Sequence, residues 1–184
     1  MKRNNHTKYA ILGLLATGFH TGYNIKQMID NSLNHFWKIS YGQIYPTLKV
    51  LVEEGLATVE DKAQEGKPDK KEYYLTSKGG EALRRWLESP LDDIPVSKNE
   101  VLLKLFFSRN QTNTQTINQL ESYKEILEER YAIYSGIEES IKSHDSMEPD
   151  AKFWFFTLDY GKRITSAEID WCQHTIHTLI QEED

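Results

Sequence analysis

Hydrophobic residues recur at helical spacing along most of the chain, and the clearest case is the stretch from Ser40 to Leu56. Ile44, Leu48 and Leu51 follow one another at steps of four and three, which places them on one side of a helix, with Val52 beside them. The other positions carry polar and aromatic side chains, namely Tyr41, Gln43, Tyr45, Thr47 and Lys49. The pattern predicts a short helix with one buried face and one polar face, which suits insertion into a DNA major groove.

Three residues mark the ends of this helix. Ser40 precedes it, and a serine hydroxyl can accept a hydrogen bond from a backbone N–H that is left unpaired in the first turn. Pro46 is tolerated only near a helix start, so we expect the helix to begin between Tyr41 and Ile44. Gly55 ends the helix, because glycine readily adopts the left-handed conformation found after a last turn.

Two helices are predicted before this one. The first covers His6 to Thr17 and is apolar on most sides, so it should be buried. The second covers residues 22–33 and is capped by Thr21. Phe36 and Trp37 lie in the connector that leads to the third helix.

A hairpin and a fourth helix are predicted after the third helix. Ala57–Asp61 and Lys70–Thr76 have the character of strands, and the charged segment between them contains Gly66 and Pro68. A helix over Ser77–Glu88 follows. Three helices and then a hairpin are the element order of a winged helix-turn-helix. The hairpin supplies four lysines that are placed to reach phosphates, Lys62, Lys67, Lys70 and Lys71.

The second half predicts helices alone. Leu91–Pro95 is acidic and follows a proline, which is typical of a linker. An apolar helix over Asn99–Ser108 comes next, and Asn113 or Thr114 is expected to cap a long helix that ends before Ser143–Met147. The apolar positions of the long helix are Ile117, Leu120, Tyr123, Leu127, Tyr131, Tyr134, Ile137 and Ile141.

The last helix, which begins near Pro149 and Asp150, has two apolar stripes. One contains Phe153, Phe156, Tyr160, Ile164, Ala167 and Trp171, and the other contains Trp154, Leu158, Ile169, Cys172, Ile176 and Leu179. A helix that is apolar on two sides lies between two partners, so we expect one stripe to pack against a second copy of the chain. The residues expected at this homodimer interface are Phe153, Phe156, Ile164, Trp171 and Leu179.

The charge distribution supports two domains with different partners. Residues 1–90 hold 13 basic and 10 acidic residues, a net charge of +3, whereas residues 91–184 hold 9 and 18, a net charge of −9. We therefore expect a mainly α protein with a winged helix-turn-helix DNA-binding domain over 1–90 and an α-helical dimerisation and effector domain over 91–184. The overall charge of −6 does not exclude DNA binding, because the local field decides where a phosphate backbone docks.

Several classes of protein are disfavoured. The apolar run near the N-terminus is shorter than a signal peptide needs, and no run approaches the roughly 18 residues of a membrane span, so a cytoplasmic location is expected. A single cysteine, Cys172, excludes an internal disulfide framework. We find no phosphate-binding loop, nucleophile elbow or paired-carboxylate arrangement, so no enzyme activity and no cofactor are expected.

Particular segments resemble the PadR family of bacterial transcriptional regulators, in the group with a multi-helix C-terminal domain. The most specific is Gln43-Ile44-Tyr45-Pro46 at its spacing from Glu54-Gly55-Leu56. The other matching segments are Lys8–Leu15, Thr21-Gly22-Tyr23, Phe36-Trp37, Tyr74-Leu75-Thr76 with Gly79, Trp86-Leu87 and Glu100–Lys104. The resemblance covers nearly the whole chain and is looser in the C-terminal half.

The resemblance implies a dimeric repressor that binds a palindromic operator and is released by a small aromatic effector such as a phenolic acid. Other members respond to drugs, and some members of the larger group activate genes. Two features depart from the family pattern. Asp69 lies among the lysines of the wing, and the face of the third helix is mostly neutral, although Lys38 lies just before that helix. Base preference therefore does not follow from the sequence.

The candidate DNA contacts divide by chemistry. Gln43 and Tyr41 are the expected base readers, because an amide can pair with adenine and a phenol can donate or pack on a thymine methyl. Tyr45 is expected to hold a phosphate or to pack on the wing. The further candidates are Ser40, Thr47, Lys49, Tyr23, Lys26, Lys67, Lys70 and Lys71, although each lysine is equally compatible with an ordinary solvated role.

Candidate ligand sites lie among aromatic and histidine residues. An effector pocket between the domains would be lined by Phe36, Trp37, Phe106, Phe107, Trp154 and Tyr160, although core packing explains most such rings equally well. Arg163 or Lys152 would pair with an effector carboxylate. Cys172, His174 and His177 lie close together, but two histidines without a second cluster do not support a metal site.

Two alternatives stay open at this point. One is a transcriptional activator of the same family, and the other is a small-molecule-binding or adaptor protein that has the winged fold and does not read DNA. The negative overall charge and the neutral third helix are compatible with the second alternative.

Overall fold

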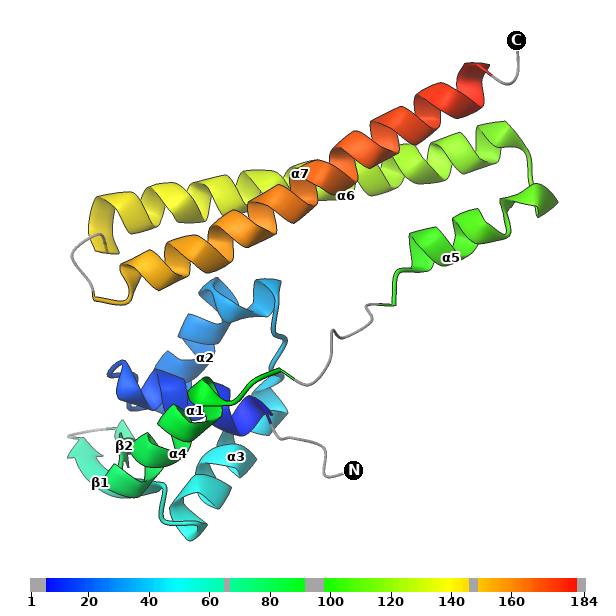
Figure 1. Ribbon diagram of the computed structural model, residues 1–184. Helices are drawn as coiled ribbons and strands as arrows, with labels where there is room; N and C mark the ends of the chain where they lie inside the picture. Colours follow the sequence, from blue (N-terminus) through cyan, green and yellow to red (C-terminus); the bar gives the residue numbers. More distant parts are fainter. Residues whose placement is uncertain (1–5, 65–66, 92–97, 146–148, 182–184) are drawn as a thin grey trace. The chain divides into compact units, whose positions relative to one another are not determined.

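A computed structural model describes residues 6–64, 67–91, 98–145 and 149–181 of the 184-residue chain. The chain divides into two compact units, Met1–Ile94 and Pro95–Asp184, and each is considered by itself. The predicted linker, Leu91–Pro95, lies outside the described residues except for Leu91. The architecture is mainly helical with a small sheet, as the sequence predicts (Figure 1).

The first unit has the predicted element order. It consists of α1 (His6–Ala16), α2 (Gly22–Asn31), a short 3₁₀ turn at Leu33–His35, α3 (Tyr41–Glu53), β1 (Ala57–Gln64), β2 (Lys67–Leu75) and α4 (Ser77–Glu88). Three helices followed by an antiparallel hairpin make this unit a winged helix-turn-helix.

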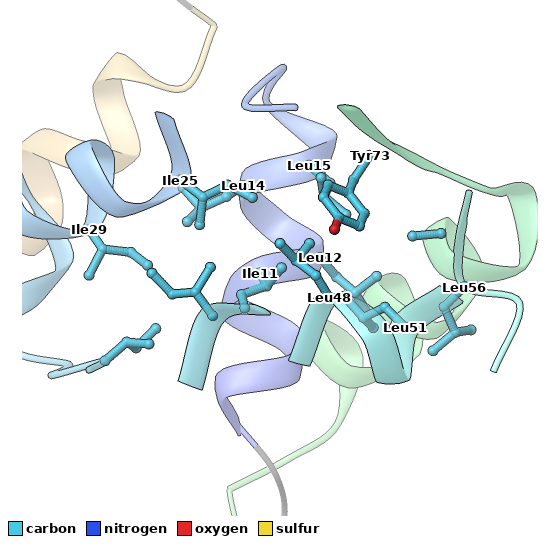
Figure 2. Packing of buried hydrophobic residues seen from close by; sticks show 13 residues of the cluster. Ile11, Leu12, Leu14, Leu15, Ile25, Ile29, Leu48, Leu51, Leu56 and Tyr73 are labelled. Carbon is cyan, nitrogen blue, oxygen red and sulfur yellow. The ribbon is translucent and has the colours of Figure 1, made fainter. Parts of the chain in front are cut away.

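The core of the first unit lies between α1, α2, α3 and the hairpin. Ile11 and Leu12 of α1 meet Leu48 and Leu51 of α3, and all four side chains are fully buried (Figure 2). Tyr73 of β2 closes the same cluster. Because α1 supplies buried residues on most sides, it has almost no polar face, as its sequence predicts.

The hairpin is longer than predicted. Its strands pair from Ala57 opposite Leu75 to Gln64 opposite Lys67, so most of the segment expected to be a turn is strand. The register shifts between Lys62 and Gln64, opposite Pro68, which has no backbone N–H to donate to a partner strand. A hydrophobicity pattern does not recognise these residues as strand, because many of their side chains are charged.

The second unit is helical throughout its described residues. It contains α5 (Glu100–Phe106), a 3₁₀ turn at Ser108–Asn110, α6 (Asn113–Ser140), a π-helical turn at Ile141–Asp145 and α7 (Ala151–Gln181). Helices α6 and α7 pack along each other as a hairpin (Figure 1). Tyr134, Ile141, Ala151 and Leu158 form the core at one end, and the other fully buried side chains include Leu120, Leu127, Thr165 and Cys172.

Two sequence-based predictions about α6 are wrong. Neither Asn113 nor Thr114 caps it: Thr112 does, because its hydroxyl accepts from Gln115 N–H while its own N–H donates to Gln115 Oε1. The helical path also continues past Ser143 as the π turn instead of breaking there, although residues 146–148 lie outside the described part.

Candidate nucleic-acid interface

Helix α3 presents the predicted two faces. Ile44, Leu48 and Leu51 are fully buried, while Tyr41, Gln43, Tyr45 and Lys49 lie on the surface. The helix begins at Tyr41 and Gly55 follows it with a φ of +69°, as expected for a left-handed terminating glycine. The prediction of a surface helix backed by an apolar stripe is confirmed.

Gln43 has a structural role at the start of α3. Both the backbone N–H and the hydroxyl of Ser40 donate to Gln43 Oε1, each over 2.9 Å. This contact is one half of a capping box, in which a side chain three residues into a helix satisfies the residue that precedes it. The amide oxygen needed to read adenine is therefore engaged in this structure.

Thr47 corrects the predicted polar face. Its side chain is only 8% exposed, and its hydroxyl donates to the Gln43 carbonyl oxygen over 2.6 Å. A threonine within a helix commonly satisfies its hydroxyl in this way. The expectation that Thr47 lies on the exposed face is wrong, because helical spacing alone does not separate a buried flank from the surface. Its contact with DNA stays a prediction.

Tyr41 and Tyr45 form an aromatic pair on α3. Their ring centroids are 5.8 Å apart in an edge-to-face arrangement. Tyr45 also lies against Gly22 at the start of α2, where a Cβ atom would come within 2.6 Å of its ring. Hydrogen bonding with Tyr41, followed by burial, raises the pKa of Tyr45, so its hydroxyl is engaged with the neighbouring tyrosine in this structure.

The start of α2 supplies a second set of polar groups. Thr21 is buried and caps the helix by accepting from Asn24 N–H over 3.1 Å, while Tyr23 is exposed. Unpaired N–H groups and the helix dipole at such an end favour a phosphate. Lys26 forms an ion pair with Asp30 one turn later, so its charge is partly compensated.

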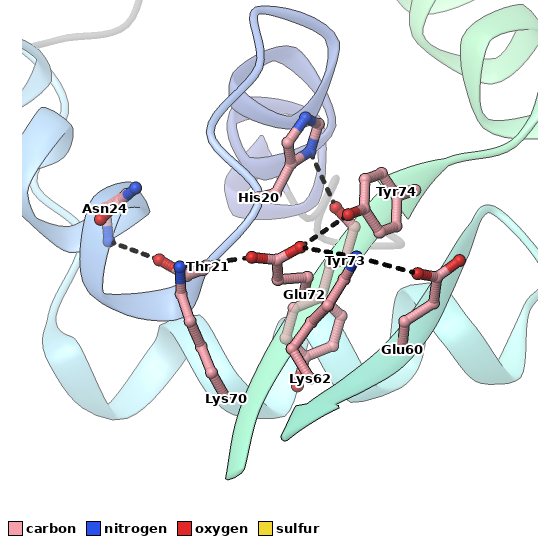
Figure 3. A network of polar contacts seen from close by, with 9 residues as sticks. All are labelled: His20, Thr21, Asn24, Glu60, Lys62, Lys70, Glu72, Tyr73 and Tyr74. Atoms are coloured by element: carbon pink, nitrogen blue, oxygen red, sulfur yellow. Dashed lines mark hydrogen bonds and ion pairs between the residues drawn. The ribbon is translucent and has the colours of Figure 1, made fainter. Parts of the chain in front are cut away.

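The hairpin is attached to the start of α2 through His20. Tyr73 N–H donates to the His20 carbonyl over 2.7 Å, and His20 Nδ1 lies 3.0 Å from the Tyr73 carbonyl (Figure 3). The His20 ring also packs against Tyr74 with centroids 4.6 Å apart. These contacts hold the lysines of β2 in a fixed relation to α2.

A groove of about 1010 Å³ joins α2, α3 and the hairpin. Its lining brings together five of the predicted DNA contacts, Tyr23, Tyr45, Lys49, Lys70 and Lys71. Asn24 lines the groove as well and was not predicted from the sequence. Its position three residues after the Thr21 cap places it in the first turn of α2, which would have indicated this location. The Lys67 side chain lies outside the described residues.

Acidic partners reduce the positive charge of this groove. Lys49 lies 3.7 Å from Glu53 of the same helix, and Lys70 lies 3.3 Å from Glu72. Lys71 is exposed and is paired in register with Asp61. The surface is thus rich in hydrogen-bond donors and only moderately basic, which agrees with the small net charge of the first 90 residues.

The candidate effector residues are divided between the two units. Phe36 and Trp37 are exposed in the first unit, and Phe106, Phe107 and Tyr160 are exposed in the second. Trp154 instead packs against the core cluster at the end of the α6–α7 hairpin, and this contact accounts for its half-buried ring. A pocket between the units stays a prediction.

The charged residues suggested for an effector carboxylate have partners on α7. Arg163 Nε donates to Asp159 over 2.8 Å, and Lys152 Nζ lies 4.7 Å from the centre of the Phe153 ring. Each contact joins residues of the same helix and leaves the side chain at the surface.

The two stripes of α7 differ in burial. Leu158 and Cys172 of one stripe are buried against the rest of the unit, whereas Phe153, Phe156 and Ile164 of the other are exposed. Trp171 and Leu179, which were also expected at a dimer interface, are half-buried. One stripe of α7 therefore has its partner within the unit, and most of the other is exposed among the described residues.

Metal-binding clusters and membrane spans are absent from the described part of the chain. It holds no group of three or more His, Cys, Asp or Glu residues arranged to bind a metal ion. Cys172 is buried, while His174 and His177 are exposed, so these three do not converge. None of the helices is both long and apolar enough to cross a lipid bilayer.

Comparison with known proteins agrees with this geometry. Residues 11–85 match the Transcriptional regulator PadR-like family, and residues 97–179 match the Virulence activator alpha C-term family. The Negative transcriptional regulator PadR of Bacillus subtilis (strain 168) is 34% identical over 149 residues, which are 78% of this chain and 81% of that protein. The chain belongs to the PadR family of transcriptional regulators.

Solved structures extend the similarity to the whole fold. A crystal structure of Bacillus subtilis PadR in complex with operator DNA has a TM-score of 0.86 and 27% identity, covering 95% of this chain and 99% of that one. A structure of the same Bacillus protein in complex with p-coumaric acid has a TM-score of 0.80 and 24% identity, covering 97% and 98%. This PadR-family chain therefore has a regulator's fold along almost its entire length.

Proposed function

We propose that this PadR-family regulator is a homodimeric, cytoplasmic repressor that binds a palindromic operator and leaves it when a small aromatic effector binds. The observation that carries the proposal is the groove at α2, α3 and the hairpin, which gathers hydroxyl, amide and amine donors from three separate segments. A bound structure of the 34% identical Bacillus relative with operator DNA supports the same role here.

In the proposed complex, each copy places the exposed face of α3 in a major groove. Gln43 and Tyr41 read base edges, while Lys49, Lys70 and Lys71 contact the phosphates beside the groove. Tyr23, Tyr45 and the N-terminal end of α2 hold a neighbouring phosphate. Two copies read half-sites about 34 Å apart, one turn of the duplex.

The exposed stripe of α7 is the proposed dimer contact. Phe153, Phe156 and Ile164 project from it, and α5 exposes Leu102, Leu103 and Phe106 in the same unit. A second copy is the proposed occupant, because a palindromic operator requires a two-fold related partner. Burial of several such side chains at about 25 cal/mol per Å² favours association.

The effector is proposed to act on the geometry of the dimer. Phe36, Trp37, Phe106 and Tyr160 are the rings proposed to contact it, because flat aromatic ligands stack on aromatic side chains. A phenolic acid is the first candidate, since a structure of the Bacillus relative contains p-coumaric acid. An effector that binds one dimer shape better lowers the population of the shape that fits both half-sites.

The test uses fluorescence anisotropy with the DNA upstream of the protein's own gene and a scrambled duplex of equal length and composition. We expect tighter binding to the upstream duplex at moderate salt and release on titration with p-coumaric acid. Equal affinities for the two duplexes would contradict a sequence-specific regulator. Specific binding that p-coumaric acid leaves unchanged would contradict only the choice of effector.

A second candidate function is activation of transcription. It is favoured by the match of residues 97–179 to the Virulence activator alpha C-term family. A reporter fused to the bound promoter separates the two functions, because deleting the regulator raises expression for a repressor and lowers it for an activator.

A further inference from the structure

The hairpin carries an unusual arrangement of charges on one face. Glu60 lies opposite Glu72, and Lys62 lies opposite Lys70, so like charges face each other at two neighbouring levels. Like charges in directly opposed positions of an antiparallel pair repel each other. Because side chains alternate between faces, these four residues and Tyr74 share one face.

Contacts along and across the strands compensate this repulsion, and Glu72 is at their centre. Its carboxylate accepts from the Tyr74 hydroxyl over 2.7 Å and lies 3.3 Å from Lys70 Nζ and 3.8 Å from Lys62 Nζ (Figure 3). Glu60 has one of these lysines as its partner, Lys62, at 3.8 Å. Glu72 is therefore within ion-pair distance of both ammonium groups and shares Lys62 with Glu60.

The tyrosine keeps this carboxylate charged and oriented. Hydrogen bonding from Tyr74, and then from Lys70, holds the pKa of Glu72 below its usual value. The hydrogen bond between Tyr74 and Glu72 also raises the pKa of Tyr74 to about 12. Glu72 is thus an anion and Tyr74 a donor throughout the physiological range. The side chain of Glu72 is partly exposed, with an exposed fraction of 20%, and those of Lys70 and Lys62 are more exposed.

A DNA phosphate that approaches this face meets lysines that already have an anionic partner. We propose that Glu72 is an internal competitor of the DNA backbone, which occupies Lys62 and Lys70 in the free protein and thereby limits the sequence-independent affinity of the wing. The inference rests on the proposed DNA-binding function. It assigns to Glu72 the task of keeping non-specific binding weak, so that the bases contacted by α3 decide where the protein stays.

The test compares Glu72→Gln with Glu60→Gln in the full-length protein. Both variants remove one negative charge at the same level of the hairpin, and a glutamine at position 72 still accepts from Tyr74. The affinity for the upstream duplex and for a scrambled duplex is measured at several salt concentrations. We expect Glu72→Gln to raise the affinity for both duplexes by up to about fivefold, the worth of an exposed ion pair.

The salt dependence identifies the cause of any gain. Each additional phosphate contact steepens the slope of log K against log salt by about 0.9, so Glu72→Gln should steepen it by about one to two units. Glu60→Gln should change affinity and slope less. In a Lys62→Gln/Lys70→Gln background, Glu72→Gln should give no gain in affinity, because the two lysines that pair with Glu72 are no longer present.

Four results would overturn the inference. Equal gains from Glu60→Gln and Glu72→Gln would assign the effect to net charge, and a gain that survives removal of both lysines would assign it elsewhere. An unchanged affinity and slope for Glu72→Gln, while the unaltered protein binds DNA, would refute the competitor role alone. Failure of the unaltered protein to bind either duplex at low salt would refute the proposed function, and the role of Glu72 with it.

Discussion

Single side chains at the candidate interface serve the fold and the proposed DNA contact at the same time. Gln43 Oε1 accepts from the backbone and hydroxyl of Ser40, yet its exposed amide is also the proposed adenine reader. Tyr45 packs on Gly22 and is also a proposed contact of a phosphate. Substitutions at such residues must therefore separate lost binding from lost helix capping.

Gln43→Glu separates the two roles of Gln43. A carboxylate still accepts from the Ser40 N–H, so the melting temperature should stay close to that of the unaltered protein. It has no N–H to donate to adenine N7, so affinity for the upstream duplex should fall by about 1–3 kcal/mol, or roughly 5- to 150-fold. Anisotropy and thermal melting measure the two effects, with Gln43→Ala as the variant that loses both. An unchanged preference for the upstream duplex would argue against base reading by Gln43.

Glu138 is expected to stabilise the α6–α7 hairpin in a pH-dependent way. Hydrogen bonds from Lys142 and Lys162 lower the pKa of Glu138 to about 2, and Lys162 Nζ reaches it from α7 over 2.6 Å. A depressed carboxyl pKa stabilises the fold above the unfolded-state value near 4.5 and loses that effect as pH falls toward 2.

Thermal melts of Glu138→Gln between pH 7 and pH 2.5 test this expectation. The variant should be less stable than the unaltered protein at pH 7, and the difference should shrink as the pH falls below about 5. Glu139→Gln, at the neighbouring exposed position, is the matched control. A deficit for Glu138→Gln that stays constant with pH would show that packing, not charge, accounts for it.

Whole elements followed from the sequence more reliably than the contacts between them. The N-cap positions of Ser40 and Thr21, the terminating Gly55 and the apolar stripe of α3 all occur as predicted, although the Ser40 hydroxyl donates to Gln43. The hairpin was underestimated because its strands are rich in charged residues, which a hydrophobicity pattern does not recognise as strand. On one face of the hairpin, glutamate and lysine alternate along each strand, at Glu60 and Lys62 of β1 and at Lys70 and Glu72 of β2.

The junction between the hairpin and α4 depends on a glycine. A Cβ atom on Gly79 would overlap the carbonyl oxygen of Leu56, while one on Gly80 would meet only the Leu75 side chain at 3.8 Å. Gly79→Ala should destabilise the first unit by about 1–3 kcal/mol through overpacking. Gly80→Ala should stabilise it by up to about 1 kcal/mol, the helix-propensity gain over glycine.

Urea unfolding of both variants tests this junction. Opposite signs for two glycine-to-alanine changes at adjacent positions are the expected result. A neutral Gly79→Ala would mean that the backbone of Leu56 moves freely away from α4, and the hairpin would then not be held as the structure indicates.

At the scale of the whole molecule, the two units differ in charge, composition and exposed surface. The first is mildly basic and carries the groove, while the second is strongly acidic and exposes the aromatic stripe of α7. Association through α7 would place two DNA-reading units in one dimer. Once the first unit has bound its half-site, binding of the second unit to the other half-site becomes intramolecular. Such linkage raises overall affinity by about 10² to 10⁴ without any new contact to the duplex.

Phe156→Asp tests this linkage. Phe156 is 68% exposed on the outer stripe, so a charge there should leave the α6–α7 core intact and disrupt association. Sedimentation should show a monomer, and affinity for a two-half-site duplex should fall by about 100-fold or more, whereas affinity for a single half-site should change little. Ser166→Asp, at an exposed polar position of α7, is the control. If the Phe156→Asp variant still formed a dimer, Phe156 would not belong to the dimer interface.

The sequence by itself determined the order of the helices and strands, the ends of α3, and that α7 has two apolar stripes. These features depend on neighbours along the chain, because capping, periodicity and glycine or proline geometry act over a few residues. Only the tertiary structure decided that Thr47 is hidden, that one stripe of α7 packs within its own unit, and that Glu72 lies between two lysines. Such facts depend on which surfaces meet, and a single helix or strand leaves several choices open that only packing and strand register resolve.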